Sequence, residues 1–192
     1  MIRAVIFDCF GVVISDALSV MTGELYQAHP EAEAQVHRWL DQANKNEISS
    51  EELSTRMSAL FGLSFDEYRA QLFQHEVKDQ VLLDYIADLR SHHKTALLSN
   101  IPKGSLQRRF SSEELARYFD AVVASGEVGY AKPEAEVYEI TADRLGVRLD
   151  ECVFTDDREP YCEGARRIGM QAILYQDFSQ FQRELEVLLA NA

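Results

Sequence analysis

The sequence is poor in the residues that mark fibrous, disordered or disulfide-bonded chains. Its 192 residues include only 9 Gly, 4 Pro and 3 Cys, while 46% are hydrophobic. This composition excludes a fibrous or disordered polypeptide. Three cysteines cannot all pair and none lies in a Cys-x-x-Cys motif, so we expect buried thiols in a reducing compartment. The length is that of one domain, or of one domain with a modest insertion.

Positive charge and long hydrophobic runs are also scarce. The chain has 19 Lys and Arg against 32 Asp and Glu, which gives a formal net charge of −13. Nucleic acids and anionic membranes are bound through cations, so we expect neither as a partner. No apolar run approaches the ~20 residues of a membrane span, and the first residues lack the apolar stretch of a secretory signal. We therefore expect a cytoplasmic protein, and its oligomeric state stays open.

Five short segments rich in Val, Ile, Leu and Phe predict β-strands. Their continuous apolar runs are typical of strands that are covered on both faces. The segments are Ala4–Phe7, Thr95–Leu98, Ala121–Ala124, Cys152–Thr155 and Ala172–Tyr175. Helical stretches follow the last four strands: Lys103–Tyr118, Pro133–Leu145 with Pro at its first position, Glu159–Ile168 and Ser179–Leu189. The alternation predicts an α/β fold with a doubly wound parallel sheet, that is, a Rossmann-like core.

The connection between the first two predicted strands is far longer than one crossover helix requires. Before a crossover helix near Val81–Arg90, it contains four helical stretches: Glu24–Ala28, Glu31–Asn44, Glu51–Phe61 and Phe65–Glu76. An insertion at this point lies beside the carboxyl ends of the strands, where open sheets bind ligands. We therefore predict a small all-helical cap domain, residues 15–77, over a core domain of residues 1–14 and 78–192. The alternative is a helical bundle packed elsewhere on the core.

Polar residues follow four of the predicted strands. They are Asp8, then Ser99 and Asn100, then Lys132, and finally Asp156 and Asp157. In a parallel sheet these strand ends converge at one edge. Three carboxylates in one cleft repel one another unless a cation lies among them. Oxygen ligands favour Mg²⁺, which leaves coordination positions for water and a substrate phosphate.

These residue types suit phosphoryl transfer. A carboxylate at a strand end can attack phosphorus and form an acyl phosphate, so Asp8 is the candidate nucleophile. Lys132 would neutralise the transferring group, while Ser99 and the backbone N–H of Asn100 would donate hydrogen bonds to it. Asp156 and Asp157 would hold the metal. A single Asp after a strand is usually a turn former or helix cap, so the argument depends on the ordered set.

The ordered set resembles the haloacid dehalogenase-like hydrolases, most of which are phosphatases. The resemblance spans the whole chain, from Phe7-Asp8 to Asp156-Asp157. It implies that Asp8 is the nucleophile and a Mg²⁺ ligand with Asp156 and Asp157, and that Ser99 and Lys132 bind phosphate. The stretch Val153–Met170 looks most like small sugar-phosphate phosphatases of the glucose-1-phosphatase type. It is also similar to the epoxide-hydrolase N-terminal phosphatase domain.

Phe10 and Tyr161 depart from the family's pattern. The phosphatases usually carry Asp-x-Asp, whose second carboxylate protonates the leaving oxygen and then activates water. The backbone carbonyl of Phe10 can still ligate Mg²⁺, but its side chain cannot transfer a proton, a contribution of roughly 10²–10⁴-fold. Tyr161 occupies a position where relatives often have Asn or Asp to brace the metal carboxylates.

Three functions stay open. The first is a Mg²⁺-dependent phosphatase of a small phosphorylated metabolite such as a sugar phosphate. The second is a pseudo-phosphatase that binds metal and a phosphorylated ligand without turnover, as Phe10 and Tyr161 suggest. The third is a 2-haloacid dehalogenase, because haloacid dehalogenases have an aromatic residue at the position of Phe10. Those enzymes work without metal, so in one of them Asp156 and Asp157 would only repel each other.

The remaining polar groups predict no second site. His92 and His93 are adjacent in an extended segment and point to opposite faces, so we expect no zinc site. Cys9 is expected in the core, and the Arg108-Arg109 pair on a solvated helix face. Substrate specificity would come from the cap between Ser15 and Glu76, where no recognisable constellation stands out.

Overall fold

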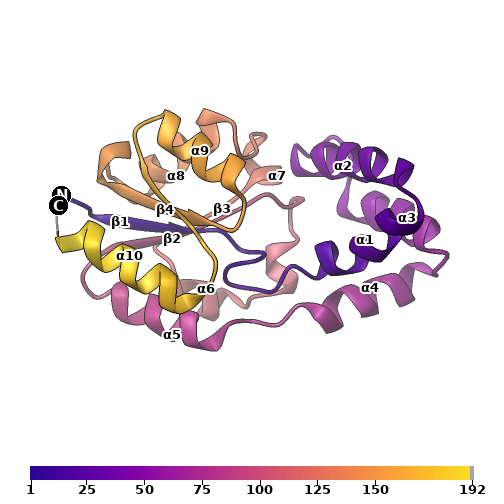
Figure 1. Ribbon diagram of the computed structural model, residues 1–192, viewed down its shortest axis with the longest axis horizontal. Helices are drawn as coiled ribbons and strands as arrows, with labels where there is room; N and C mark the ends of the chain where they lie inside the picture. The colour runs from indigo at the N-terminus through magenta and orange to yellow at the C-terminus, as the bar shows by residue number, and fades with distance from the viewer. Residues whose placement is uncertain (191–192) are drawn as a thin grey trace.

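The computed structural model describes residues 1–190. Its five strands are β1 (Ala4–Phe7), β2 (Lys94–Ser99), β3 (Ala121–Ala124), β4 (Cys152–Asp156) and β5 (Gln171–Leu174). They form one parallel sheet in the order β3-β2-β1-β4-β5, with β1 at the centre (Figure 1). This confirms the doubly wound α/β fold. The four strands whose ends carry the polar residues are therefore neighbours.

Helices cover both faces of the sheet (Figure 1). On one face lie α5 (Gln80–Leu89), α6 (Ser112–Tyr118) and α10 (Phe178–Ala190), and on the other lie α8 (Ala135–Leu145) and α9 (Glu159–Arg167). Successive β1 side chains enter two different buried clusters: Val5 and Phe7 join the first, while Ala4 and Ile6 join the second. A strand buried on both faces needs apolar residues at every position, which explains its continuous apolar run.

Four further helices pack beyond the carboxyl ends of the strands (Figure 1). They are α1 (Ala17–Ala28), α2 (Glu31–Asn44), α3 (Ser50–Phe61) and α4 (Phe65–His75). Their buried cluster of Val36, Met57 and Tyr68 is separate from the two clusters at the sheet. The two segments that connect these helices to the sheet meet at Ser15, whose Oγ accepts from Val77 N–H (2.8 Å) and donates to His75 O (2.6 Å).

Side-chain caps set where several helices begin. The Ser-x-x-Glu spacing occurs at three helix starts: Ser64 and Ser111 form complete capping boxes, whereas Ser49 only accepts from the N–H of Glu52. Asp16 accepts from Ser19 N–H (3.0 Å), so α1 begins at Ala17. The prediction that this helix begins at Glu24 is therefore wrong. The helix begins earlier than predicted because its capping side chain, Asp16, lies well before the stretch of helix-forming residues.

Two loops differ from the predicted helices. The stretch 103–118 contains only a short 3₁₀ turn, η1 (Leu106–Arg108), before α6, and a one-turn helix, α7 (Ser125–Val128), follows β3. The helix predicted from Pro133 begins instead at Ala135. Hydrogen bonds between residues 131 and 134 hold Lys132 and Pro133 in a turn before the helix. A second 3₁₀ turn, η2 (Leu149–Glu151), precedes β4.

Among residues 1–190, no helix combines the length and apolar character that a bilayer crossing requires.

Candidate active site

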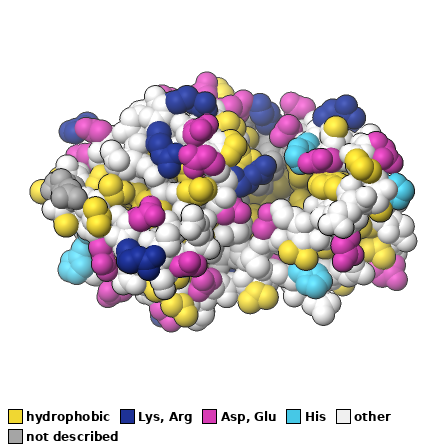
Figure 2. Space-filling view, in the orientation of Figure 1, with side chains coloured by type: hydrophobic (Ala, Val, Ile, Leu, Met, Phe, Trp, Pro, Cys, Tyr) yellow, Lys and Arg dark blue, Asp and Glu magenta, His cyan; other side chains and the backbone are white. Residues whose placement is uncertain are grey.

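The polar strand ends meet at a cavity of about 270 Å³ between the sheet and the inserted helices. Figure 2 shows the hollow between the two lobes, with hydrophobic side chains inside it and Lys or Arg side chains at its border. The predicted site residues that line this cavity are Asp8, Phe10, Ser99, Asn100 and Lys132. The other two, Asp156 and Asp157, each have an oxygen within 4.8 Å of a carboxylate oxygen of Asp8. The fold therefore brings all seven together.

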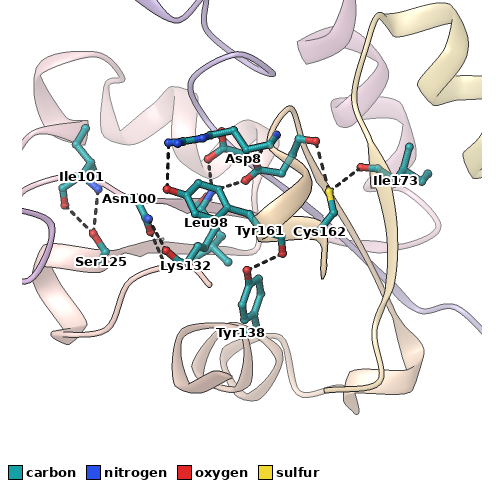
Figure 3. Close-up of polar contacts among 12 residues, drawn as sticks. Asp8, Leu98, Asn100, Ile101, Ser125, Lys132, Tyr138, Tyr161, Cys162 and Ile173 are labelled. Atoms are coloured by element: carbon teal, nitrogen blue, oxygen red, sulfur yellow. Dashed lines mark hydrogen bonds and ion pairs between the residues drawn. The ribbon is translucent and has the colours of Figure 1, made fainter. Parts of the chain in front are cut away.

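Lys132 lies at the centre of this group (Figure 3). Its Nζ donates to the carboxylates of Asp8 and Asp156 (2.6 Å to the latter) and to Leu98 O (3.3 Å). All three charged side chains are buried, with at most 8% of any of them exposed. Burial acts to lower the pKa of Lys132, but Asp156 and Asp8 outweigh it and hold that pKa above its usual value. The site therefore keeps a permanent positive charge next to the candidate nucleophile.

The side chain of Asn100 fixes the backbone of Lys132. Its Oδ1 accepts from Lys132 N–H (2.8 Å), and its Nδ2 donates to Lys132 O (3.0 Å). The segment after β2 is itself fastened to the end of β3, because Ser125 Oγ accepts from Ile101 N–H (3.0 Å; Figure 3). The sequence predicts a role only for the backbone N–H of Asn100, and the structure adds a positioning role for its side-chain amide.

Asp157 is positioned by a close approach to Gly11. This glycine has a φ of +89°, and a Cβ there would lie only 2.3 Å from Asp157 Oδ2. Within residues 1–190, the buried Oδ1 of Asp157 has no hydrogen-bond partner. Asp156 differs, because its two oxygens accept from Arg158 N–H (2.9 Å) and from Lys132.

Burial also shifts the acidity of the carboxylates. Desolvation raises the pKa of Asp8 to about 7, against the opposing effect of Lys132. Desolvation, with a contribution from Asp156, raises the pKa of Asp157 to about 6. Such clustered carboxylates are costly without a cation, because each disfavours the charge of the others. Their oxygen-only donor set fits Mg²⁺. The unpartnered oxygen of Asp157 is a free ligand atom for such an ion.

Ser99 and Tyr161 also line the cavity. Ser99 is fully buried, and its Oγ lacks a hydrogen-bond partner in the described part of the chain. Tyr161 presents its ring to Lys132 Nζ, 5.1 Å from the ring centroid, while its hydroxyl accepts from Arg158 Nη1 (3.1 Å). Its backbone oxygen accepts from Tyr138 (2.8 Å; Figure 3). Tyr161 therefore contacts Lys132 through its ring, and its hydroxyl is engaged by Arg158.

The expectation of a solvated Arg108-Arg109 pair is wrong for Arg109. Its side chain is only 10% exposed, lines the cavity and pairs with Glu76 at 2.5 Å. The guanidinium carbon lies 5.0 Å from the centre of the Phe10 ring and 5.1 Å from that of Phe73. In place of the predicted helix Lys103–Tyr118 the chain forms only the 3₁₀ turn η1, which ends at Arg108, so Arg109 lies in a loop and not on a solvated helix face.

Sequence reasoning missed Arg109 and Glu76 as cavity residues. Glu76 directly follows the last helix of the insertion, and Arg109 lies in an irregular loop of the core. Neither belongs to a periodic pattern or a motif of fixed spacing. Their juxtaposition depends on how the inserted helices pack over the sheet, so no local signal could have identified it.

Comparisons with known proteins show which family the chain belongs to. The model of the haloacid dehalogenase-like hydrolase family matches residues 2–169. Bifunctional epoxide hydrolase 2 of Rattus norvegicus is 40% identical over 73 residues, which are 38% of this chain, but the match covers only 13% of that protein's length. D-ribitol-5-phosphate phosphatase of Bacteroides thetaiotaomicron is 24% identical over 205 residues, covering 98% of this chain and 99% of the relative.

Solved structures show the same fold. A HAD family enzyme of Bacteroides thetaiotaomicron, in complex with magnesium and inorganic phosphate, superposes with a TM-score of 0.73. The two chains are 22% identical, and the match covers 94% of this chain and 99% of the other. With the family match over most of its length, the chain belongs to the haloacid dehalogenase-like hydrolase family.

Proposed function

We propose that this haloacid dehalogenase-like hydrolase is a Mg²⁺-dependent phosphatase, which acts on a small phosphorylated metabolite through an aspartyl-phosphate on Asp8. The observation that carries the proposal is the cluster of Asp8, Asp156 and Asp157 around buried Lys132, next to the cavity. Relatives named D-ribitol-5-phosphate phosphatase and fructose-1-phosphate phosphatase support a sugar or polyol phosphate as substrate. In this proposal residues 15–77 form the cap domain, and residues 1–14 and 78–192 form the core.

Mg²⁺ would be held by Asp8, Asp156 and Asp157, together with the backbone carbonyl of Phe10. The ion would supply charge neutralisation for the phosphoryl group. Lys132 would contribute a second, permanent positive charge on the same group. Ser99 Oγ, which is buried and unpaired among the described residues, would donate its hydrogen bond to a phosphoryl oxygen.

The reaction would proceed in two displacements at phosphorus. A carboxylate oxygen of Asp8 attacks the phosphorus, and the bond from phosphorus to the leaving oxygen breaks. The leaving alkoxide takes its proton from water. A water molecule then attacks the phosphorus of the acyl phosphate, and the bond from phosphorus to the Asp8 oxygen breaks. This step restores the Asp8 carboxylate, transfers a proton from the water to solvent and releases phosphate.

Because Phe10 has no acidic or basic side chain, water would have to donate and accept the protons in both displacements. The ring of Phe10 lies against Arg109 at the cavity wall and offers no proton donor. Positioned acid–base catalysis contributes roughly 10²–10⁴-fold, so we expect slow turnover and the best rates for good leaving groups such as an anomeric phosphate. Phe10→Asp should raise turnover. No gain would mean that proton transfer is not what limits this site.

The experiment compares phosphate release by the wild type and Asp8→Asn over a panel of sugar and polyol phosphates with Mg²⁺. The proposal predicts release by the wild type, loss of release on chelation and no release by the variant. Equal release by both proteins would refute Asp8 as the nucleophile.

A second candidate is a non-catalytic phosphate-binding protein, which the aromatic side chain of Phe10 favours. It predicts Mg²⁺-dependent binding of phosphorylated ligands with no phosphate release from any member of the panel. A 2-haloacid dehalogenase would instead release halide from a 2-haloacid in the presence of chelator. Lys132 pairs with Asp8 and Asp156, but Asp157 would stand beside Asp156 without a cation of its own, which argues against that metal-free reaction.

A further inference from the structure

The ion pair between Arg109 and Glu76 lies at the cavity and leaves buried polar atoms without partners, which a purely structural pair does not need. It joins the end of the last inserted helix to the core loop after η1, and both side chains line the cavity. The two side chains are 10% and 6% exposed. Burying an ion pair is costly unless nearly every donor and acceptor is used. Its unused atoms are therefore informative.

One buried nitrogen and one buried oxygen of this pair have no hydrogen-bond partner among residues 1–190. Arg109 Nη2 donates to Glu76 Oε1 (2.5 Å), and Arg109 Nη1 donates to Ser105 O (2.9 Å). In the part of the chain that the structure describes, the buried Arg109 Nε and Glu76 Oε2 make no hydrogen bond. Each unmade buried hydrogen bond is unfavourable. A ligand group in the cavity that bonded to both atoms would remove this cost.

Aromatic rings fix the direction of the Arg109 guanidinium. The rings of Phe10, from the core, and Phe73, from α4, each lie about 5 Å from its carbon. Because the Ser105 and Glu76 contacts add two further constraints, Arg109 cannot turn to satisfy its Nε elsewhere without breaking them. The pair is therefore preorganised next to Phe10, two residues after the candidate nucleophile.

The chemistry of the two unused atoms selects the ligand group. A hydroxyl both donates and accepts, so it can bond to Glu76 Oε2 and Arg109 Nε at once or through neighbouring hydroxyls. A second anionic group would be repelled by Glu76, and a cationic group by Arg109. We propose that the Arg109–Glu76 pair is the subsite for the leaving group and that it selects a polyhydroxylated one. This inference rests on the phosphatase function proposed above and specifies its substrate class.

The test uses matched substrates that differ only in hydroxyl groups. The kcat/KM of the wild type is measured for a pentitol monophosphate and for n-pentyl phosphate. A pentitol bisphosphate is measured as well, to test whether the subsite accepts a second anionic group. Two variants are compared. Glu76→Gln keeps the size of the side chain and removes its negative charge, and Arg109→Lys keeps the positive charge and removes the Nε donor. Arg166→Lys, in the exposed Arg166–Glu159 pair at 2.6 Å outside the cavity lining, is the matched control. Thermal melting establishes that each variant is folded.

The wild type should prefer the pentitol monophosphate over n-pentyl phosphate. Hydrogen bonds to charged groups contribute enough that each cavity variant should reduce this preference about ten- to hundredfold, whereas the control should retain it. An equal fall in kcat/KM for both monophosphates would mean a structural role only. A preference for the bisphosphate would also overturn the proposal, since it requires an anion subsite.

The same substrates distinguish failure of this inference from failure of the phosphatase function. If the wild type releases phosphate from none of them, the proposed function is wrong. Calorimetric titration with Mg²⁺ and each monophosphate then tests the subsite alone. Equal affinity of the wild type for the two monophosphates would refute it, and a preference that both cavity variants lose would support it.

Discussion

The contact between Gly11 and Asp157 gives a sharp test of the metal site. A Cβ on Gly11 would lie 2.3 Å from Asp157 Oδ2 and 3.0 Å from Oδ1, so Gly11→Ala must displace this carboxylate. The φ of +89° also makes any side chain at this position strained, at a cost of roughly 1–2 kcal/mol. The variant therefore combines a general backbone cost with a specific displacement of one candidate Mg²⁺ ligand.

A second glycine separates the two effects. Gly169, between α9 and β5, has a φ of +98°, and within residues 1–190 no atom lies within 4 Å of its would-be Cβ. Gly169→Ala should therefore lose about 1–2 kcal/mol of unfolding free energy and nothing else. Gly11→Ala should lose at least as much stability and, in addition, bind Mg²⁺ about 10–100-fold more weakly, the range found when a ligand's support is removed.

The assay is calorimetric titration of each folded variant with Mg²⁺, together with urea unfolding. Unchanged Mg²⁺ affinity in Gly11→Ala would contradict the assignment of Asp157 as a ligand. An equal loss of affinity in Gly169→Ala would show that strain alone, rather than displacement of the carboxylate, weakens binding.

Three further predictions concern the charged centre. Asn100→Ala removes both hydrogen bonds to the backbone of Lys132, so the free energy of unfolding should fall by about 1–3 kcal/mol and KM should rise. An unchanged KM would argue against the positioning role of Asn100. Lys132→Met leaves Asp8 and Asp156 buried without their cation, so urea unfolding should show a loss of about 3–5 kcal/mol at neutral pH and a smaller loss in acid, where the carboxylates are protonated. Equal losses would contradict the pairing. The raised pKa of Asp157 means that the folded, metal-free protein binds more protons than the unfolded one, so stability should fall as the pH rises from 3.8 through about 6. Asp157→Asn should reduce that dependence, and an identical pH profile would refute the assignment.

The sheet could be predicted from the sequence because its signals are local. Ala4–Phe7 and Ala121–Ala124 are observed with the predicted bounds, and the remaining three strands differ by one or two residues. Continuous apolar runs are required when both faces of a sheet are covered, and that pattern is independent of distant contacts. The convergence of Asp8, Ser99 and Asp156, which stand at the ends of neighbouring parallel strands, follows from the strand order.

The remaining features depend on packing between distant segments. The helix predicted from Pro133 begins at Ala135, because hydrogen bonds to Asn100 and within the turn aim Lys132 at Asp8. The burial of Arg109 against Glu76 similarly requires the inserted helices to lie over the core. Sequence periodicity carries no information on such contacts, so the residues that would choose the leaving group emerged only from the structure.

Rapid acid quenching followed by mass spectrometry tests whether an aspartyl-phosphate forms on Asp8. Because Phe10 supplies no base for the second displacement, the acyl phosphate should accumulate when the wild type turns over a good substrate with Mg²⁺. We expect a phosphoryl adduct on the peptide that contains Asp8, and we expect none in Asp8→Asn or in the presence of chelator. Substrate turnover by the wild type without that adduct, or the same adduct in Asp8→Asn, would contradict the role of Asp8 as nucleophile.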